Sequence, residues 1–493
     1  MVTRRNFLFG AAGVAAAAAL PSEAWLKELK KEYSNVLMFV VDDLNDWIEP
    51  MSGHPNTKTP NISRLASEAT LFENAQAPAP LCGPSRTAIL TGHTPSETGI
   101  YMHIEDDKIR LASDVAANSV FMSQYFKMHG YYTAGIGKIF HQGAAPGSFD
   151  VYGGRGGGKG GFGPKPDKKM NWDKKGTQTD WGPFPERDEM MPDYEAAQWL
   201  KEQLSMNHDK PFFLVGGFLR PHVPWHVPQK WFDMHPVDEL VTPPYLASDL
   251  DDVPEIAKQI SYWPSMPTME WVQENDQWKN IIQAYLASIT FVDSCIGTVL
   301  DALENSEYAD NTAIVLWGDH GYHLGEKGRF SKGDLWERST RTPLIIKPAK
   351  NAKKQTVSKP VNLMDIYPTM VSLAGLPKNH TIGGNDLSSL IADPNLDWPY
   401  PSLTTYGPNN HALKDERYRY IRYEDGSEEL YDHSNDENEW KNLALDPAYD
   451  DVKKRLQAHL PTEHATWTPY SGHKGNEYFT KLTEEARQVL ELE

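Results

Sequence analysis

Cysteine is scarce in this sequence. Its 493 residues include two cysteines, too few for the disulfide framework that stabilises many small secreted domains. Cys295 lies in an apolar, helix-like stretch and is expected to be buried in the core. Cys82 lies instead in a loop-forming run rich in proline, glycine and serine. This contrast marks Cys82, rather than Cys295, as a candidate for chemistry.

The sequence also has fewer basic than acidic residues and few long apolar runs. The chain has 48 Lys and Arg residues against 67 Asp and Glu residues, which gives a formal net charge of −19. Such a balance argues against nucleic acid or an anionic membrane surface as the partner. Beyond the N-terminus no apolar run is long enough to cross a bilayer, so we expect no transmembrane segment in the mature chain.

The N-terminal segment has the features of an export signal. Arg4 and Arg5 precede Phe-Leu and an alanine-rich apolar run over residues 10–20, and Ser22-Glu23-Ala24 offers a small-residue cleavage site. Paired arginines in this setting are typical of a twin-arginine signal. We therefore interpret residues 1–24 as an export signal and expect the mature protein to be periplasmic or secreted. An ordinary secretory signal and an uncleaved anchor are the alternatives.

Strand and helix patterns alternate through most of the chain. Helical patterns separate the apolar, β-branched runs, and such alternation predicts an α/β fold with a mostly parallel sheet covered on both faces. The expected strands are residues 35–41, 132–136, 212–216, 312–317 and 344–347. The expected helices are residues 60–69, with Thr59 as cap and Pro60 in first position, 119–129, 193–206, 279–304 and 364–374.

The pattern changes after Pro377. Residues 417–423 and 429–431 are strand-like and flank a tight Asp-Gly turn, which predicts a β-hairpin. We therefore divide the mature chain into a large N-terminal catalytic domain, residues 33–380, and a small α+β C-terminal subdomain, residues 381–493.

Residues 152–180 are rich in glycine and lysine and have little periodicity. They are expected to form a long, flexible surface loop, and whether this loop borders a substrate cleft is left open.

Acidic residues follow two of the predicted strands. Asp42 and Asp43 come directly after residues 35–41, and Asp319 follows residues 312–317. Ligands bind outside the carboxyl ends of strands in open α/β sheets, so the three carboxylates are expected to converge on one cation. Hard oxygen ligands suit Ca²⁺ or Mg²⁺. Solvated loop carboxylates are the alternative interpretation.

The segment around Cys82 reads Leu-Cys-Gly-Pro-Ser-Arg-Thr-Ala-Ile-Leu-Thr-Gly from position 81 to position 92. Its Cys-x-Pro-Ser-Arg core, followed by a short helix and Thr-Gly, resembles the signature of the type I sulfatases. The Gly-Lys-x-Phe-His and Pro-His-x-Pro arrangements are most similar to the iduronate-2-sulfatase-like members. The resemblance covers nearly the whole mature chain and includes Val41–Leu44, Gly137–His141, Arg220–Pro224, Gly318–Glu326, Glu429–Asp432 and Asn442–Ala444.

The resemblance implies a fold, a modified residue and a metal. The fold would be an alkaline-phosphatase-like sandwich. In this family a formylglycine-generating enzyme oxidises the motif cysteine, here Cys82, to formylglycine (3-oxoalanine). The hydrated aldehyde, a gem-diol, attacks sulfur, the alcohol leaves, and the second hydroxyl expels sulfate as the aldehyde re-forms. One divalent metal, with Ca²⁺ as the expected ion, would assist.

Roles for individual residues follow from the same resemblance. The metal ligands would be Asp42, Asp43, Cys82, Asp319 and His320. The other catalytic residues would be Arg86, which holds and orients the gem-diol; Lys138, His222 and Lys332, which contact the sulfate, with His222 or Lys332 protonating the leaving oxygen; and His141, the base for the elimination. Many sulfatases have Asn where this chain has His320, and a ring nitrogen suits softer ions better than Ca²⁺.

The resemblance implies no role for three further histidines. His411 is a candidate to reach the cleft from the small subdomain and contact the sugar. His103 and His323 are expected to be ordinary loop histidines.

We therefore expect an exported, exo-acting sulfatase of sulfated poly- or oligosaccharides, with 2-O-sulfated uronate as one substrate class. A phosphoesterase of the same superfamily is one alternative, but that class uses Ser or Thr as the nucleophile and commonly two zinc ions. An inactive glycan-binding homologue with an unmodified Cys82 is the other, and the full set of lysines and histidines argues against it. The sequence does not distinguish between sugars or sulfate positions.

Overall fold

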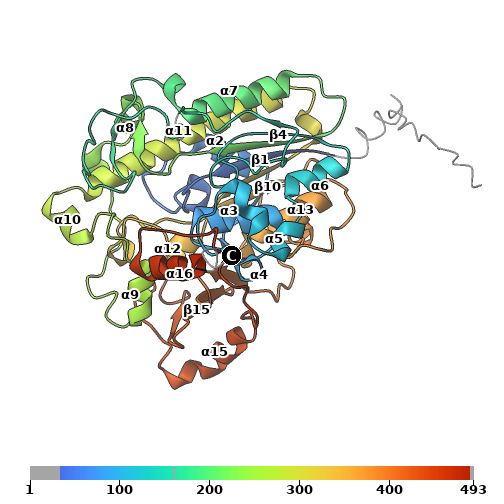
Figure 1. The fold of residues 1–493 in the computed structure, drawn as a ribbon. Coiled ribbons are helices and arrows are strands. Elements are labelled where there is room, and N and C mark those ends of the chain that lie inside the picture. The colour runs from blue at the N-terminus through green and yellow to red at the C-terminus, as the bar shows by residue number, and fades with distance from the viewer. Residues whose placement is uncertain (1–33, 159–160, 489–493) are drawn as a thin grey trace, which may run out of the picture.

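An eight-stranded sheet forms the centre of the molecule (Figure 1). The computed structural model describes residues 34–158 and 161–488, so the export signal predicted at residues 1–24 lies outside the described residues. Neighbouring strands are parallel except β10, which runs antiparallel to both of its neighbours. In sheet order the strands are β11 (Gln355–Val357), β2 (Thr70–Phe72), β10 (Leu344–Lys347), β9 (Thr312–Gly318), β1 (Asn35–Val41), β7 (Phe212–Phe218), β4 (Tyr132–Gly137) and β5 (Val151–Tyr152).

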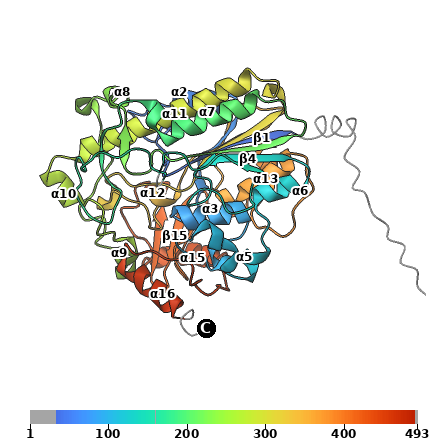
Figure 2. The same cartoon turned by 45° about the horizontal axis from the view of Figure 1, so that its top comes forward.

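Helices cover both faces of this sheet (Figures 1 and 2). Along β1, Leu37 and Phe39 pack into the core of one face, whereas Val36 and Met38 pack into the core of the other, as the period of two in a strand requires. The sheet is therefore buried on both faces, as predicted. The first face carries α2 (Pro60–Ala66), α7 (Pro192–Ser205) and α11 (Trp278–Glu304), and the second carries α3 (Cys82–Thr91), α6 (Met122–Met128) and α13 (Ile366–Leu373).

Shorter elements fill the connections between these layers. They are β3 (Ala75–Gln76), α4 (Pro95–Thr98), α5 (Asp114–Asn118), β6 (Trp181–Pro183), β8 (Trp225–Val227), α8 (Gln229–Asp233), α9 (Glu255–Ser261), α10 (Met269–Glu274), α12 (Glu337–Thr340), β12 (Val361–Asn362) and α14 (Ser388–Ala392).

The predicted elements lie close to the observed ones. The strands expected at residues 35–41 and 344–347 have those bounds, and the other three extend by one or two residues. The helix predicted over residues 119–129 is shorter and begins at Met122, because Phe121 before it has an extended backbone. The helix predicted over residues 364–374 begins as a 3₁₀ turn before α13.

Thr59 occupies the N-cap position of α2, but its hydroxyl does not cap that helix. Thr59 Oγ1 instead accepts a hydrogen bond from the backbone N–H of Glu49 at 2.9 Å. The carboxylate of Asp293, on α11, accepts from the N–H groups of Asn61 and Ile62 at 3.1 and 2.8 Å. The cap therefore comes from a residue far away in the sequence, which a local pattern does not reveal.

Helix α11 is long and apolar enough, by length and composition, to cross a membrane. However, 78% of its most apolar window is buried inside the fold. Cys295 lies in this helix and in the core of the first face, as predicted. The apolar character of α11 is thus explained by packing against the sheet.

The C-terminal part forms a second, four-stranded antiparallel sheet of β13 (Ser402–Thr405), β14 (His411–Lys414), β15 (Tyr418–Arg422) and β16 (Glu428–Asp432). Strands β15 and β16 are the predicted hairpin, and Gly426 in its turn has a φ of 90°, a conformation that favours glycine. Helices α15 (Asp450–Gln457) and α16 (Glu477–Arg487) follow. The boundary at residue 380 stays a prediction.

The chain returns from this subdomain to the end of the large sheet. The backbone N–H of Gly472 donates to the carbonyl of His103 at 2.8 Å, and Ser471 forms a β-bridge with Ile104. Residues near the C-terminus therefore border the region where the large sheet's strands end.

Candidate active site

Two adjacent strand ends bring three carboxylates together. The register pairs Val41 of β1 with Gly318 of β9, so the residues that follow, Asp42 and Asp319, lie side by side. The backbone N–H of Asp43 donates to Asp319 Oδ1 at 3.0 Å. All three aspartates have no exposed surface. Buried carboxylates at this spacing require cations close by.

Two of these cations are the side chains of Arg86 and Lys138. Arg86, on α3, donates from Nε to Asp319 Oδ2 at 2.7 Å and from Nη2 to Asp42 Oδ1 at 3.1 Å. Lys138 follows β4, and its Nζ donates to Asp42 Oδ2 at 2.6 Å. Burial alone would raise the pKa of Asp42, but the positive charges of Lys138 and Arg86 hold that pKa well below its ordinary value.

Lys332 supplies the third cation. Its ammonium forms an ion pair with Asp43 Oδ1 and lies 3.2 Å from the sulfur of Cys82. Burial raises the pKa of Asp43, and Lys332 offsets only part of that effect. Burial would in turn lower the pKa of Lys332, but Asp43 and the other anionic groups hold it well above its ordinary value.

Cys82 is the first residue of α3, two residues earlier than the helix start predicted near Pro84. Leu81 before it is extended, and Pro84 falls within the first turn, where a missing backbone N–H costs no helical hydrogen bond. Cys82 is 1% exposed, and its sulfur lies 3.2 Å from His320 Nε2. Burial, followed by the nearby Asp42 carboxylate, raises the pKa of the thiol well above its ordinary range. This environment does not by itself create a thiolate nucleophile.

The five predicted metal ligands fit a divalent cation. Ligand atoms of Cys82, Asp319 and His320 lie within 4.8 Å of one another, as do those of Asp42, Asp43 and Cys82 together with His222. Oδ2 of Asp43 is buried and has no hydrogen-bond partner among the described residues. Such an unpartnered oxygen is what a cation would bind.

His320 has the tautomer that a metal ligand needs. Its Nδ1 lies 2.8 Å from the carbonyl of Gly321, and because a carbonyl only accepts, Nδ1 carries the proton. Nε2 is then the ring nitrogen left to bind a metal, and it lies 3.4 Å from Asp43 Oδ1 and 3.6 Å from Asp319 Oδ1. The donor set is thus three carboxylates, one imidazole and the group at position 82.

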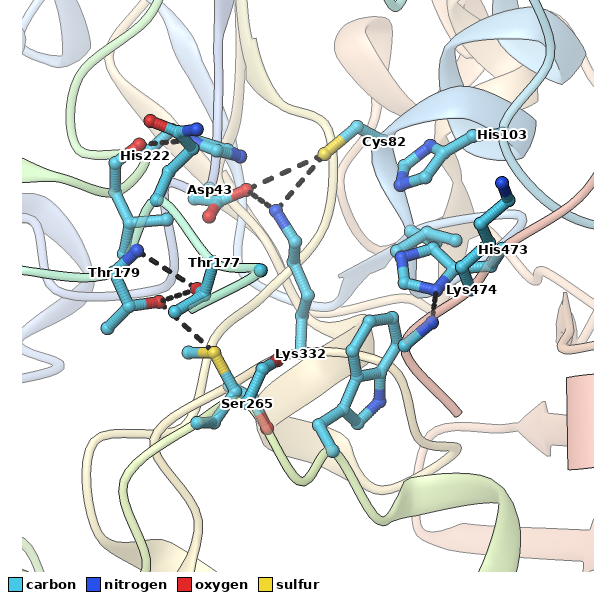
Figure 3. Close-up of a pocket in the computed structure, with 18 of the residues that line it drawn as sticks. Asp43, Cys82, His103, Thr177, Thr179, His222, Ser265, Lys332, His473 and Lys474 are labelled. Carbon is cyan, nitrogen blue, oxygen red and sulfur yellow. Dashed lines mark hydrogen bonds and ion pairs between the residues drawn. The ribbon is translucent and has the colours of Figure 1, made fainter. Parts of the chain in front are cut away.

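A pocket of about 730 Å³ opens onto Cys82. Ligand pockets of small molecules typically occupy about 300–1,000 Å³, so the space holds far more than a sulfate group. Its floor contains Asp43, Cys82 and Lys332, which Figure 3 shows linked to one another. Its walls are residues 174–179, residues 263–266 and residues 473–475.

The predicted site residues divide into two layers. Asp43, Cys82, His141, His222 and Lys332 line the pocket itself. Behind them lies a buried layer of ion pairs made by Asp42, Arg86, Lys138, Asp319 and His320. Arg86 and Lys138 pair with the buried carboxylates and are not among the residues that line the pocket, and their predicted roles at the gem-diol and the sulfate stay predictions.

His222 presents one ring nitrogen to a fixed partner. Its Nδ1 lies 2.6 Å from the carbonyl of Val223, so that nitrogen carries the proton. Burial, then Lys332, lowers the pKa of His222 well below its ordinary value. In this state His222 is a neutral imidazole and Lys332 is a cation.

His411 is not brought to this pocket. It lies in β14, is buried, and its Nδ1 lies 3.1 Å from Thr405 Oγ1 while its ring stacks on His464. The candidate sugar contact from the small subdomain therefore has no support in its position. His323, expected to be an ordinary loop histidine, pairs with Asp334 at 3.1 Å.

His103, also expected to be an ordinary loop histidine, lies in the pocket (Figure 3). Its ring stacks on that of His141 with centroids 3.9 Å apart and planes 14° apart. The close approach of His103 to α3 explains Gly83, because a Cβ at that position would lie 2.8 Å from His103 Nδ1. Nothing in the local sequence pattern distinguishes His103 from a surface histidine.

The pocket walls supply further residues that sequence reasoning missed. Trp263 packs its ring edge-on against His473, with centroids 4.4 Å apart. Lys174, Lys175 and Lys474 also line the pocket. These residues come from three separate loops, so only the fold brings them together.

The sequence profile of the family described as Sulfatase matches residues 34–376. A profile described as N-sulphoglucosamine sulphohydrolase, C-terminal, matches residues 325–466, and one for the twin-arginine translocation pathway signal sequence matches residues 1–21. The last match confirms the export signal and hence a location in the periplasm or beyond.

Two curated relatives are similar over most of the chain. A sulfatase of Formosa agariphila is 47% identical over 473 residues, which is 92% of this chain and 92% of the relative. The iduronate 2-sulfatase of Mus musculus is 29% identical over 398 residues, 70% of this chain and 69% of the relative. The predicted resemblance to sulfatases, including iduronate 2-sulfatases, is confirmed.

Two solved structures share the fold. One, in complex with its substrate D-glucosamine-2-N,6-O-disulfate, has a TM-score of 0.68 at 21% identity and covers 86% of this chain and 96% of that chain. The phosphonate monoester hydrolase of Agrobacterium radiobacter has a TM-score of 0.71 at 20% identity, over 86% of this chain and 94% of that chain. Their likeness supports the predicted α/β fold with its C-terminal subdomain and nothing finer.

Proposed function

This chain belongs to the sulfatase family, and we propose that it hydrolyses sulfate esters of carbohydrates after export. The observation that carries this proposal is the pocket of about 730 Å³ whose floor holds Cys82 between Lys332 and His320. The Lys332 ammonium at this floor can contact a sulfate group, and the remaining space is large enough for the sugar that bears it.

Two groups that the family generally uses fit the residues present. Asp42, Asp43, Asp319 and His320 would hold a divalent cation, expected to be Ca²⁺, together with the group at position 82. The cation would neutralise charge on the sulfate oxygens, and a formylglycine made from Cys82 would supply a hydrated aldehyde whose oxygen attacks sulfur. Arg86, which bridges Asp42 and Asp319, would keep these ligands in register.

Lys332 is the better proton donor for the leaving oxygen. It lines the pocket, lies 3.2 Å from the sulfur of Cys82 and carries its proton at neutral pH. His222 faces the same space but is neutral, with its one proton committed to the carbonyl of Val223. We therefore assign the proton to Lys332, and to His222 a hydrogen-bonding role at the sulfate oxygens.

His141 is proposed as the base that releases sulfate. Burial, followed by Lys138, lowers the pKa of His141 well below its ordinary value, so its ring is neutral and able to accept a proton. Stacking on His103 restrains the ring plane. Because the ring is already held in one orientation, less entropy is lost when it reaches the geometry for proton transfer.

The substrate is proposed to be a sulfated poly- or oligosaccharide attacked at its end. Three loops wall the pocket at residues 174–179, 263–266 and 473–475, which favours a terminal sugar over the middle of a chain. The iduronate 2-sulfatase relative makes a 2-O-sulfated uronate the first substrate class to test.

The experiment measures inorganic sulfate. The mature chain is coexpressed with a formylglycine-generating enzyme and offered 2-sulfated uronate disaccharides, sulfated hexosamines, carrageenan and ulvan oligosaccharides, an aryl sulfate and a phosphonate monoester. Cys82→Ala is the inactive comparison, and Cys295→Ala is the matched control, since it removes a cysteine that lies in the core.

We expect sulfate release from one sugar class by the wild type and by Cys295→Ala, and none by Cys82→Ala. A peptide mass showing the aldehyde at position 82 without release from any member would exclude the substrate classes in the panel. Hydrolysis of the phosphonate alone would favour the phosphoesterase alternative. Absence of both aldehyde and release would leave the glycan-binding alternative.

A further inference from the structure

The mouth of the pocket carries lysines that pair with no carboxylate of the described residues. Acidic residues outnumber basic ones in this chain, 67 against 48, yet Asp43 is the one carboxylate among the described residues that line the pocket. Lys332 already pairs with it. Lys174, Lys175 and Lys474 line the same pocket, are exposed, and form no ion pair within the described ranges.

We propose that Lys174, Lys175 and Lys474 form a second anion-binding subsite, the rim subsite, which holds a carboxylate or a further sulfate on the substrate beyond the sulfate that is removed. This inference rests on the proposed function and narrows its substrate to a glycan with at least two anionic groups. A substrate with a cationic group next to its sulfate, such as choline sulfate, would be disfavoured.

One wall of the rim subsite is held in place by a single lysine. Lys169 Nζ donates to the carbonyls of Lys174, Thr177 and Thr179 at 2.8, 3.0 and 3.2 Å. Thr177 and Thr179 also share a hydrogen bond between their hydroxyls at 2.8 Å. Although the sequence predicted a flexible loop here, this part is tied to its own backbone and presents Lys174 and Lys175 from a defined turn.

The base of the same loop is fixed by Asp180. Its carboxylate accepts the backbone N–H groups of Met170, Asn171 and Trp172 at 2.9, 2.9 and 3.1 Å. His226 Nε2 lies 3.0 Å from the same carboxylate. Both ends of the segment that carries the two lysines are therefore anchored to buried groups.

Hydrogen bonds also fix the opposite wall of the rim subsite. Asn476 Nδ2 donates to the carbonyls of Gln259, Ile260 and Tyr262 at 2.8, 3.1 and 2.8 Å, which fixes the segment that carries Lys474. Figure 3 shows His473 and Lys474 on the side of the pocket occupied by His103, across from Thr177 and Thr179. The lysines thus face the pocket from two sides.

Between these walls Trp263 offers a surface for a sugar ring. Its indole is half-buried and braced edge-on by His473. Aromatic faces bury the apolar face of a ring at low entropic cost. A sugar lying there, with its sulfate at Cys82, would direct its other substituents toward the rim lysines.

The size of the effect follows from the exposure of these lysines. Ion pairs at solvent-exposed sites contribute about 0.2–1 kcal/mol each, or roughly a 1.4- to 5-fold change in affinity per lysine. Several like charges around one concave mouth also attract an anion at long range, and salt screens that attraction. Loss of all three lysines should therefore cost about 3- to 125-fold in affinity and flatten the salt dependence.

The test measures binding, so it does not depend on turnover. Calorimetry on the inactive Cys82→Ala protein would compare three disaccharides with the same 2-sulfated uronate: the methyl ester, the free carboxylate, and the methyl ester with a further sulfate on the neighbouring sugar. The variants are Lys174→Gln with Lys175→Gln, and Lys474→Gln. Matched controls are Lys353→Gln with Lys354→Gln, another exposed lysine pair, and Lys454→Gln on α15.

We expect one of the dianionic probes to bind more tightly than the mono-anionic ester, and to lose about 1.4- to 5-fold in affinity for each rim lysine removed. If the free carboxylate binds more tightly than the ester, the second anion is a carboxylate. If the ester with the further sulfate does so, the second anion is a sulfate. The mono-anionic ester should lose less affinity in the rim variants than the dianionic probe does, and the two control variants should change the affinity of neither.

Equal binding of all three probes, or equal losses in the rim variants and the controls, would overturn the rim subsite. A different outcome would reject the proposed function while keeping the rim subsite. In that case the formylglycine-bearing enzyme would bind the dianionic disaccharide with the expected dependence on the lysines, but would release no sulfate from it.

Discussion

The assignment of the leaving-group proton to Lys332 predicts a dependence on the leaving group. Lys332→Met removes both a charge and a proton at the pocket floor. A nitrophenolate leaves without being protonated, whereas a sugar alkoxide does not. The variant should therefore lose much more activity on a sugar sulfate than on 4-nitrophenyl sulfate.

The magnitudes can be worked from the position of Lys332. At about 4 Å and an effective dielectric of about 20, two unit charges interact by about 4 kcal/mol. The ion pair with Asp43 offsets roughly half of this, which leaves about 2 kcal/mol, or about 30-fold, on the aryl sulfate. Proton transfer typically contributes a further 10²- to 10⁴-fold. The loss on the sugar sulfate should thus be at least about 10³-fold.

The assay compares kcat/KM for the two substrates in Lys332→Met, Lys332→Arg and His222→Gln, with thermal unfolding to verify the fold. Lys332→Arg keeps the charge but cannot release its proton, so it should recover the aryl sulfate and not the sugar sulfate. His222→Gln should lose about 10- to 100-fold on both. If His222→Gln were selective for the sugar sulfate and Lys332→Met were not, the proton would belong to His222.

Four further predictions concern the site and the stability of the fold. His103→Ala should lower kcat several-fold by releasing His141, with KM little changed, and His103→Phe should recover most of it by restoring the stack. Chelation with EDTA should abolish sulfate release and lower the melting temperature, and in His320→Asn Ca²⁺ should restore activity better than Mn²⁺ or Zn²⁺. Arg86→Gln should cost about 3–5 kcal/mol in the free energy of unfolding, measured in urea, because it leaves buried carboxylates uncompensated. Asp365 is buried in the 3₁₀ turn before α13, and burial raises its pKa to about 7, so the folded protein keeps this proton to a higher pH than the unfolded chain does. The free energy of unfolding should therefore fall by up to about 4 kcal/mol from pH 4 to pH 7, and Asp365→Asn should remove that slope.

The sequence predicted the sheet well because its signal is local. The seven consecutive residues of β1 are all buried, and a continuous apolar run of that length is what a strand covered on both faces needs. Asp42 and Asp319 were placed together by a general rule about strand ends, which the register of β1 and β9 satisfies. The twin-arginine signal was likewise carried by adjacent residues.

The parts that were missed depend on contacts between distant segments. The start of α3 at Cys82 escaped prediction because proline is accepted anywhere in a helix's first turn. No sequence signal distinguishes His411 from His103. In the structure His411, in β14, lies beside Thr405, whereas His103, in a loop, stacks on His141. Trp263 lines the pocket through loop packing, which no periodicity encodes.

The near-complete burial of Cys82 sets an order of events. With 1% of its surface exposed, the side chain is out of reach of another enzyme once the loops around it have closed. The segment of residues 473–475, which forms one of the pocket walls, lies far downstream of Cys82 in the sequence and is therefore synthesised long after it. Under the proposed modification, oxidation therefore has to happen while the chain is still incomplete or open. A chain that closes too soon would be well folded, exported and permanently inert.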